Sequence, residues 1–373
     1  MLGLVAVVLP VLGVLAWQRC RGPRLVRSMQ RLGIVLACQF AALLFIGAGV
    51  NDYGYFFTSW AELRGIAGQA LSPGSQQFRV HARSAAIGVA PASAGTVKVL
   101  GDAGSTAARR WPTHGRVVSV TIVGAASGLR SHAFVYLPPQ YFQRAYAHYR
   151  FPAAEVMTGY PGDDVALVRR LRYPDLQARL VRQHRARPMV LVLLRPTITF
   201  PRDTECTDVP NGPQTLTFFA ADLPAEIAQA YRVRSVGWGA VGDSTGGYCA
   251  AKITMTHPLV FRAGAALSGY YFAAHNPTTG DLWNGSVVVR HLNDLKWRLT
   301  HMPAPPVSLL ITTSVTEGGA DGYSEAQAFY RLVRPPMKVQ MLVASQGGHN
   351  FVTWRRVLPA AMAWLSGRLA GAP

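Results

Sequence analysis

The N-terminal part of the chain alternates between apolar and basic segments. MLGLVAVVLPVLGVLAW (residues 1–17) is uncharged, and so is LGIVLACQFAALLFIGAGV (residues 32–50). The segment between them contains Arg19, Arg21, Arg24, Arg27 and Arg31. A signal peptide carries its positive charge before the apolar run, whereas here the charge follows it. The pattern predicts two transmembrane helices joined by a cytoplasmic arginine loop, with all later residues outside the cytoplasm. A buried hairpin of core helices is the alternative.

The apolar pattern changes twice more along the chain. The membrane anchor is expected over residues 1–64. Residues 65–114 are rich in Ala, Gly, Ser and Pro without a periodic apolar pattern, which is typical of a flexible linker. In residues 115–373, β-branched runs alternate with helical stretches, and PMVLVLLRPT is a continuous apolar run of the kind found in doubly covered strands. This part is predicted to be an α/β domain, with a mostly parallel central sheet and helices on both faces.

The stretch AVGDSTGGYCAAKITMTHP (residues 240–258) places a serine between a strand and a helix. Ser244 lies in a G-x-S-x-G pattern, after the strand-like SVGWGAVG and before a helical segment that Pro258 ends. A serine at a sharp strand-to-helix turn is the nucleophile elbow of the α/β-hydrolase fold. An ordinary helix start with an N-cap serine has a similar sequence. The interpretation therefore depends on whether catalytic partners exist.

Suitable partners follow two later strands. TTSVTEGGADGY contains Glu317 and Asp321, and ASQGGHNF contains His349 in a glycine-rich turn. Serine, acid and histidine in this order match the α/β-hydrolase triad. The histidine removes the serine proton, and the acid orients the histidine. Position favours Glu317, which comes first after its strand. Asp321 is the alternative acid, unless it only caps the following helix.

The oxyanion hole requires two backbone N–H groups. One should belong to Thr245, directly after the nucleophile, and the other to the loop MTGYPG after an early strand. Pro161 has no N–H group, so Tyr160 is the expected donor. Pro161 and Gly162 are also typical of a type II turn, which would present the same amide.

Two cysteines lie in the predicted outer domain. Cys206 belongs to the turn-rich segment RDTECTD, and Cys249 lies on the helix after the elbow. In an oxidising compartment they are expected to form a disulfide, and two buried thiols are the alternative. No cysteine or histidine spacing is typical of a metal site, and we predict neither a metal nor a cofactor.

The composition narrows the possible partners. The formal net charge is +19, and half of the 373 residues are hydrophobic. The basic residues are nearly all arginines, scattered along the chain without a basic stripe between aromatic residues, which argues against nucleic-acid binding. An anionic lipid surface or cell envelope explains the charge equally well.

Five segments together resemble a known family. VYLPPQYF, MTGYPG, GDSTGGYCA, LSGYY and QGGHNFVTW are similar to motifs of the esterase D and mycolyltransferase family of α/β-hydrolases, from about residue 115 to the C-terminus. The resemblance implies Glu317 as the acid, His349 as the base, and the Tyr160 and Thr245 amides as oxyanion donors. Many members of that family are secreted and soluble, whereas this chain has two predicted spans.

These features predict a multi-pass cell-membrane protein with an extracytoplasmic catalytic domain. It would be a serine esterase or acyltransferase that forms an acyl-enzyme at Ser244 on a carboxylic ester or glycolipid-type substrate. One alternative is mycolyltransferase-like acyl transfer to a sugar hydroxyl. Another is a non-catalytic envelope protein with a hydrolase fold, which would have no need of all three triad residues.

Overall fold

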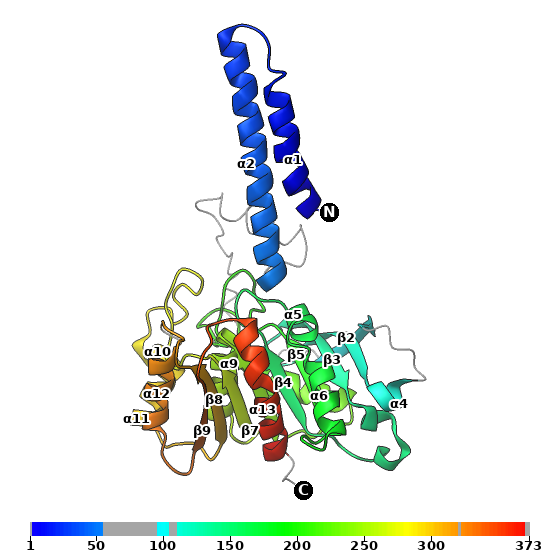
Figure 1. Ribbon diagram of the computed structural model, residues 1–373. Coiled ribbons are helices and arrows are strands. Elements are labelled where there is room, and N and C mark those ends of the chain that lie inside the picture. The colour runs from blue at the N-terminus through cyan, green and yellow to red at the C-terminus, as the bar shows by residue number, and fades with distance from the viewer. Residues whose placement is uncertain (1, 55–94, 104–109, 320–321, 370–373) are drawn as a thin grey trace, which may run out of the picture. The chain divides into compact units, whose positions relative to one another are not determined.

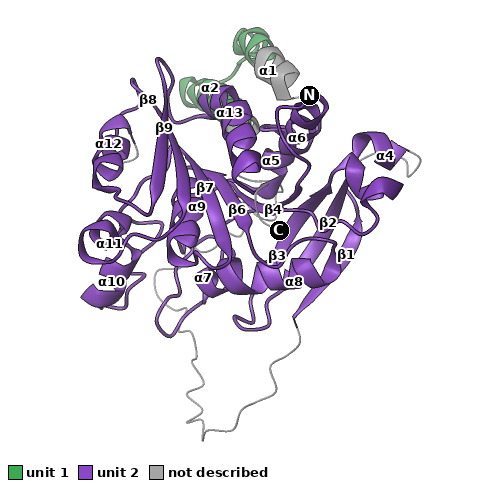
Figure 2. Ribbon diagram, turned by 90° about the horizontal axis from the view of Figure 1, so that it is seen from below, with its two compact units in different colours: residues 1–60 green, residues 61–373 purple. Residues whose placement is uncertain are grey.

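The computed structural model describes residues 2–54, 95–103, 110–319 and 322–369 (Figure 1). Its residues form two compact units, Met1–Trp60 and Ala61–Pro373 (Figure 2). The first contains two helices, and the second contains the central sheet with its covering helices. Most of the predicted linker, residues 65–94, lies outside the described residues.

The first unit is a hairpin of α1 (Leu2–Trp17) and α2 (Arg24–Gly54), which lie side by side (Figure 1). Within the described residues, only Arg24–Gly49 of α2 is long and apolar enough to cross a membrane. The prediction of two transmembrane helices and a multi-pass protein is therefore wrong. The 16 residues of α1 span about 24 Å at ~1.5 Å per residue, which is less than a hydrocarbon layer of ~30 Å.

The arginine loop is also shorter than predicted. The turn lies near Gly22 (φ 115°), and α2 begins at Arg24, directly after Pro23. Arg27 and Arg31 consequently belong to the helix itself. Arginine is a good helix former, and proline at a helix start costs no internal hydrogen bond.

The second unit is built on one sheet of nine strands among the described residues. The strands are β1 (Thr96–Asp102), β2 (Arg116–Val123), β3 (Arg130–Leu137), β4 (Ala153–Met157), β5 (Val190–Leu194), β6 (Trp238–Asp243), β7 (Phe261–Leu267), β8 (Ser308–Ser314) and β9 (Lys338–Ala344). Their order is β1-β2-β3-β5-β4-β6-β7-β8-β9. The pairs from β1 to β5 are antiparallel, and those from β5 to β9 are parallel. The predicted mostly parallel α/β sheet is confirmed.

Strand β1 corrects the predicted domain boundary. Thr96–Asp102, which we expected in the linker, pairs with β2 from Thr96 opposite Val123 to Asp102 opposite Val118. The alternation of Val97 and Val99 with polar residues is a strand pattern, but it is too short to stand out within the alanine- and glycine-rich segment. The short helix α4 (Trp111–His114) also lies before the expected boundary at residue 115.

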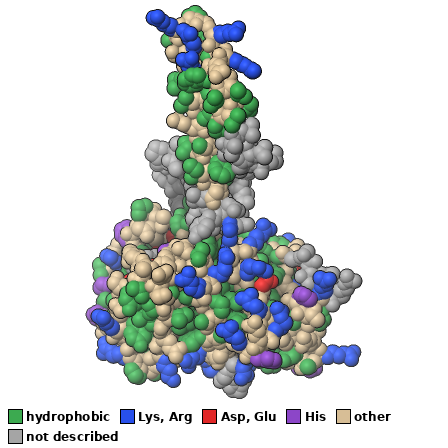
Figure 3. Space-filling model, in the orientation of Figure 1, with side chains coloured by type: hydrophobic (Ala, Val, Ile, Leu, Met, Phe, Trp, Pro, Cys, Tyr) green, Lys and Arg blue, Asp and Glu red, His purple; other side chains and the backbone are tan. Residues whose placement is uncertain are grey.

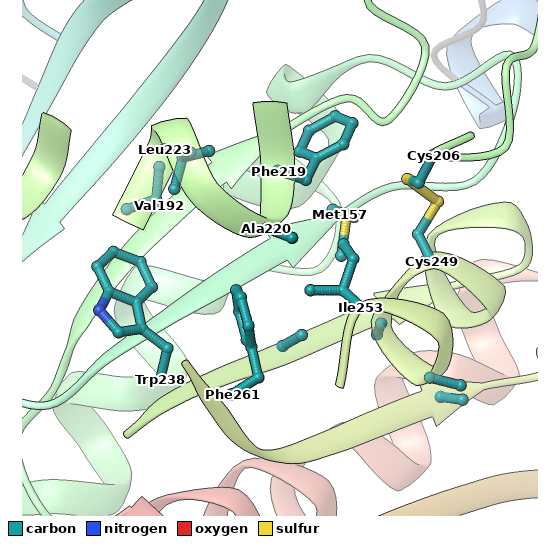
Figure 4. Close-up of a cluster of buried hydrophobic side chains, with 14 of the residues drawn as sticks. Met157, Val192, Cys206, Phe219, Ala220, Leu223, Trp238, Cys249, Ile253 and Phe261 are labelled. Carbon is teal, nitrogen blue, oxygen red and sulfur yellow. A yellow bond between two sulfur atoms is a disulfide. The ribbon is translucent and has the colours of Figure 1, made fainter. Parts of the chain in front are cut away.

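Helices cover both faces of this sheet. They are α5 (Asp164–Arg169), α6 (Tyr173–Arg182), α7 (Thr215–Thr217), α8 (Leu223–Ala230), α9 (Thr245–Thr256), α10 (Val287–Asn293), α11 (Leu295–His301), α12 (Tyr323–Leu332) and α13 (Phe351–Leu369), with short turns η2 (Pro139–Phe142), η3 (Arg144–Tyr146) and η4 (Phe218–Asp222). Trp238 of β6 lies in one core cluster with Leu223 of α8 and Ile253 of α9 (Figure 4). A Cβ atom on the next residue, Gly239, would instead meet Leu365 and Leu369 of α13. Because adjacent strand residues point to opposite faces, α8 and α9 cover one face and α13 the other.

The segment DVALVRRLRYPDLQARLVRQH, one of the helical stretches expected in residues 115–373, forms two helices, α5 and α6. Arg172 takes the left-handed conformation (φ 53°) between α5 and α6. Pro174 follows in the first turn of α6, where its missing N–H group is tolerated. A proline in the middle of one continuous helix would remove an internal hydrogen bond, so the chain restarts the helix there.

Candidate active site

Ser244 lies at a sharp turn between β6 and α9. Its φ and ψ angles are 55° and −123°, and its side chain makes no capping hydrogen bond to the helix. The ordinary N-cap explanation therefore does not apply. A Cβ atom on Gly242 would lie 2.4 Å from the carbonyl of Gly246, and one on Gly246 would lie 2.4 Å from the carbonyl oxygen of Met157. Only glycine fits at these two positions, which explains the G-x-S-x-G spacing.

The loop after β4 lies directly against the serine. A Cβ atom on Gly159 would be 2.7 Å from the Cβ atom of Ser244. The Gly159 amide donates to Asp243 Oδ2 at 3.0 Å. Because that amide is already occupied, the next one along the loop, at Tyr160, is the candidate oxyanion donor. The other candidate, Thr245, is the first residue of α9.

The turn in this loop differs from the expected type. The Gly162 amide donates to the Gly159 carbonyl at 2.8 Å, and the peptide bond between Tyr160 and Pro161 is cis. A cis-proline at this position belongs to a type VI turn, so the type II expectation is wrong.

A histidine–carboxylate pair lies at the ends of the two last strands. Glu317 follows β8 and is buried, and its Oε1 lies 3.0 Å from Nδ1 of His349, which follows β9. A bond through Nδ1 holds the ring in the orientation that a base acting through Nε2 requires. Asp321, the alternative acid, lies outside the described residues.

Two residues to which the sequence analysis gave no role hold Glu317 in place. The Ser268 hydroxyl, at the end of β7, donates to Glu317 Oε2 at 3.0 Å. It also accepts a hydrogen bond of 3.0 Å from the indole N–H of Trp354 on α13. The rings of Trp354 and His349 meet edge to face at 5.1 Å. The sequence signals were that Ser268 directly follows a strand and that Ser268 and Trp354 lie in the motifs LSGYY and QGGHNFVTW.

Asp243 joins the elbow to the loop after β4. Burial raises the pKa of its carboxyl group to about 7, although the hydrogen bond from Gly159 and the nearby charge of His349 lower it. In the sequence, Asp243 is only the variable residue of the G-x-S-x-G pattern. Its position between an apolar strand and the nucleophile was the available signal.

A buried polar network lies behind Thr245. The Thr245 hydroxyl donates to Asp203 Oδ2 at 3.2 Å, and the Tyr270 hydroxyl donates to Glu205 Oε1 at 2.6 Å. The Lys252 ammonium group donates to the Glu205 carbonyl oxygen at 3.1 Å. Burial raises the pKa of Asp203 to about 6 and that of Glu205 to about 8, and it lowers the pKa of Lys252 to about 7.

The predicted disulfide is present in the structure. Cys206 and Cys249 are joined, with Cα atoms 5.7 Å apart, and the bridge ties the loop that carries Asp203 and Glu205 to α9 (Figure 4). Across the described residues, no group of three or more His, Cys, Asp or Glu side chains could hold a metal ion.

Comparison with known structures shows the fold. An S-formylglutathione hydrolase from Agrobacterium tumefaciens matches with a TM-score of 0.60 and 15% identity over 73% of this chain and 99% of its own. A ferulic acid esterase matches with a TM-score of 0.57 and 19% identity over 69% and 99% of the two chains. The fluorophosphonate-binding serine hydrolase F of Staphylococcus aureus matches with a TM-score of 0.52 and 15% identity, over 68% of this chain and 98% of its own.

Sequence comparison finds a match to one protein-family model. No curated protein matches the chain. Residues 125–304 match the family model Esterase, described as "Putative esterase". The matched segment contains the oxyanion loop and the Ser244 elbow, whereas Glu317 and His349 follow it. The α/β-hydrolase fold agrees with this match, which covers 180 of the 373 residues, and both findings indicate an esterase-type serine hydrolase.

Proposed function

We propose that the protein hydrolyses carboxylic esters with Ser244 as nucleophile, His349 as general base and Glu317 as the acid that orients it. The observation that carries this proposal is the 3.0 Å contact between Glu317 Oε1 and His349 Nδ1. It lies at the same edge of the sheet as the Ser244 turn, because all three residues follow the carboxyl ends of parallel strands.

In the first half-reaction, the Ser244 hydroxyl attacks the ester carbonyl carbon while His349 takes its proton. The amides of Tyr160 and Thr245 stabilise the negative oxygen of the tetrahedral intermediate. The intermediate collapses, the bond to the alcohol oxygen breaks, and the alcohol takes the proton from His349. In the second half-reaction water attacks the acyl-enzyme by the same route and releases the acid. Glu317 stabilises the imidazolium in both halves.

The structural neighbours support an acyl ester as the substrate. They include an S-formylglutathione hydrolase and a ferulic acid esterase, whose names denote the cleavage of a thioester and of an ester. Both chemistries use the acyl-enzyme route described above.

We also propose that the catalytic unit lies outside the cytoplasm. The apolar helix Arg24–Gly49 is a candidate anchor, and its arginines lie at its N-terminal end. By the positive-inside rule, that end faces the cytoplasm and the residues after the helix lie outside. The Cys206–Cys249 bridge supports an oxidising compartment.

A fluorophosphonate probe tests the nucleophile. We expect covalent labelling of the wild-type protein and none of Ser244→Ala, with loss of p-nitrophenyl ester turnover of about a thousandfold or more. Ser286→Ala, which removes only the N-cap of α10, is the matched control and should label normally. Labelling of correctly folded Ser244→Ala would contradict the assignment. Adding trehalose to the assay tests whether a sugar hydroxyl also accepts the acyl group.

A further inference from the structure

A cavity of about 360 Å³ lies at the opposite edge of the sheet from Ser244. It is lined by the start of β2, the end of β3, and helices α4 and α6. Tyr136 of β3 pairs with Leu191 near the start of β5, whereas the candidate active site lies beyond the ends of the parallel strands. The two sites share no lining residue.

Four arginines surround this cavity: Arg116, Arg172, Arg179 and Arg182. Basic side chains are spread over the surface in Figure 3 with few acidic ones among them, so exposed positive charge alone does not mark a site. The distinguishing feature here is that four guanidinium groups border one hollow. A concave wall concentrates their field and removes part of the competing water.

The carboxylates of the cavity neutralise only half of these charges. Asp102 accepts a charge-assisted hydrogen bond from Arg116, and Asp175 pairs with Arg172 at 2.8 Å. Arg179 and Arg182 have no ion-pair partner among the described residues. Two positive charges therefore remain. The carbonyl end of α6, where both arginines lie, offsets about half a unit of charge.

Tyr136 adds a neutral hydrogen-bond donor to the wall. Its hydroxyl is buried and has no hydrogen-bond partner among the described residues. Burial raises the pKa of this phenol, and the charges of Arg182 and Asp175, which line the same cavity, shift it in opposite directions. A buried O–H group without a hydrogen-bond partner is stabilised when it donates a hydrogen bond to a ligand oxygen.

We propose that this cavity binds a phosphomonoester dianion between Arg179, Arg182 and the Tyr136 hydroxyl. The two arginines without ion-pair partners in the described part of the chain attract the two negative charges of the ligand. Guanidinium groups bind phosphate oxygens through paired N–H donors, which favours phosphate over a spherical anion such as chloride. The volume admits the phosphate together with a small organic group. The phosphate can belong to a soluble phosphoester or to a lipid headgroup.

Binding is measured on the full chain in detergent at constant ionic strength, with glycerol 3-phosphate and chloride as the probes. Trp111, in the cavity wall, provides a fluorescence signal, and thermal unfolding provides a second one. We expect glycerol 3-phosphate to quench or enhance the fluorescence and to raise the melting temperature, whereas chloride does neither. Arg179→Gln combined with Arg182→Gln should weaken binding at least tenfold, and Tyr136→Phe by about fivefold.

The matched control is Arg169→Gln combined with Arg185→Gln, which removes the same charge from exposed positions that do not line the cavity. It should bind as wild type does. Equal weakening in both double variants, or no preference for the phosphoester over chloride, would overturn the proposal. Mixed micelles containing phosphatidate distinguish the sources: tighter binding there than to glycerol 3-phosphate indicates a lipid headgroup, and equal binding a soluble ligand. Ester turnover should be unchanged in all these variants.

Discussion

At the scale of single residues, the chain of hydrogen bonds from Trp354 through Ser268 to Glu317 sets the position of the acid. Trp354→Phe keeps an aromatic ring beside His349 but removes the N–H donor. We expect kcat to fall about tenfold, equivalent to ~1.4 kcal/mol, with KM unchanged, because the lost N–H donor acts only through Ser268. Trp364→Phe on the same helix, where the indole N–H contacts Gln340, is the control. A loss confined to KM, or an equal loss in both variants, would contradict this positioning role.

The identity of the acid can be tested with isosteric substitutions. Glu317→Gln keeps the shape of the side chain but removes the charge that stabilises the imidazolium of His349. We expect kcat to fall by at least about a hundredfold with little change in substrate binding. Asp321→Asn should remain near wild type in the same steady-state assay. The reverse result would assign the acid to Asp321 and leave the roles of Ser244 and His349 intact.

Glu205 should make stability depend on pH. Its pKa in the folded protein, about 8, lies above its ordinary value of 4.5. The folded state therefore holds this proton more tightly, and the contribution to stability is lost as pH rises from about 4.5 towards 8. Glu205→Gln is permanently neutral and still accepts the Tyr270 hydrogen bond. We expect its melting temperature to fall less than that of wild type between pH 5 and 7.

The comparison of melting temperatures stops at pH 7 because a second buried group titrates above that value. The pKa of Lys252 is lowered to about 7, so this group adds stability as pH rises above 7 and would oppose the effect of Glu205. Asp175→Asn, at an exposed carboxylate, should keep the wild-type slope. A parallel pH dependence in Glu205→Gln and wild type would show that this carboxyl does not titrate as described.

At the scale of elements, the disulfide holds the 203–208 loop against α9. The bridged cysteines are 43 residues apart, and closing such a loop stabilises the fold by about 4 kcal/mol in the chain-entropy account. Cys206→Ser combined with Cys249→Ser should lose about that much in urea unfolding. It should also lower kcat, because Asp203 and Thr245 are no longer held together. Cys20→Ser with Cys38→Ser, outside the bridge, is the control for both measurements.

The elements were predictable where the local sequence requires them. The elbow needs glycine at Gly242 and Gly246 because backbone atoms leave no room for Cβ atoms, so its signature is visible in the sequence. Strand β1 was missed because its pairing with β2 stabilises a segment whose own composition is typical of a linker. The break before α6 required weighing Pro174 against a strong apolar pattern. Tertiary pairing and single prolines override composition in these cases.

At the scale of the whole molecule, the number of spans decides where the N-terminus lies. A single span through Arg24–Gly49 puts the N-terminus in the cytoplasm and the catalytic unit outside, whereas two spans would put both outside. Green fluorescent protein fused before residue 1 should fluoresce, and alkaline phosphatase fused after residue 373 should be active. A dark N-terminal fusion with an active C-terminal fusion would contradict the single span.

The order of the candidate site residues was predictable, but their supports were not. Ser244, Glu317 and His349 follow the ends of β6, β8 and β9, which the order of strands along the chain reveals. Ser268 and Trp354 meet at Glu317 only because β7, β8 and α13 pack together. The network of Asp203, Glu205 and Lys252 likewise depends on a loop that the disulfide holds to α9. Contacts between distant segments leave no local pattern.

The placement of the proposed acid and base after β8 and β9 has a consequence for the synthesis of the protein. β9 ends at Ala344, and His349 follows it, so both proton-handling groups come from the last part of the chain. A nascent chain that has completed the Ser244 elbow has a serine without a base, and its hydroxyl is inert. If the catalytic unit is exported during synthesis, esterase activity begins only after the final strand has crossed. Ester-bearing metabolites of the cytoplasm would then never meet an active enzyme.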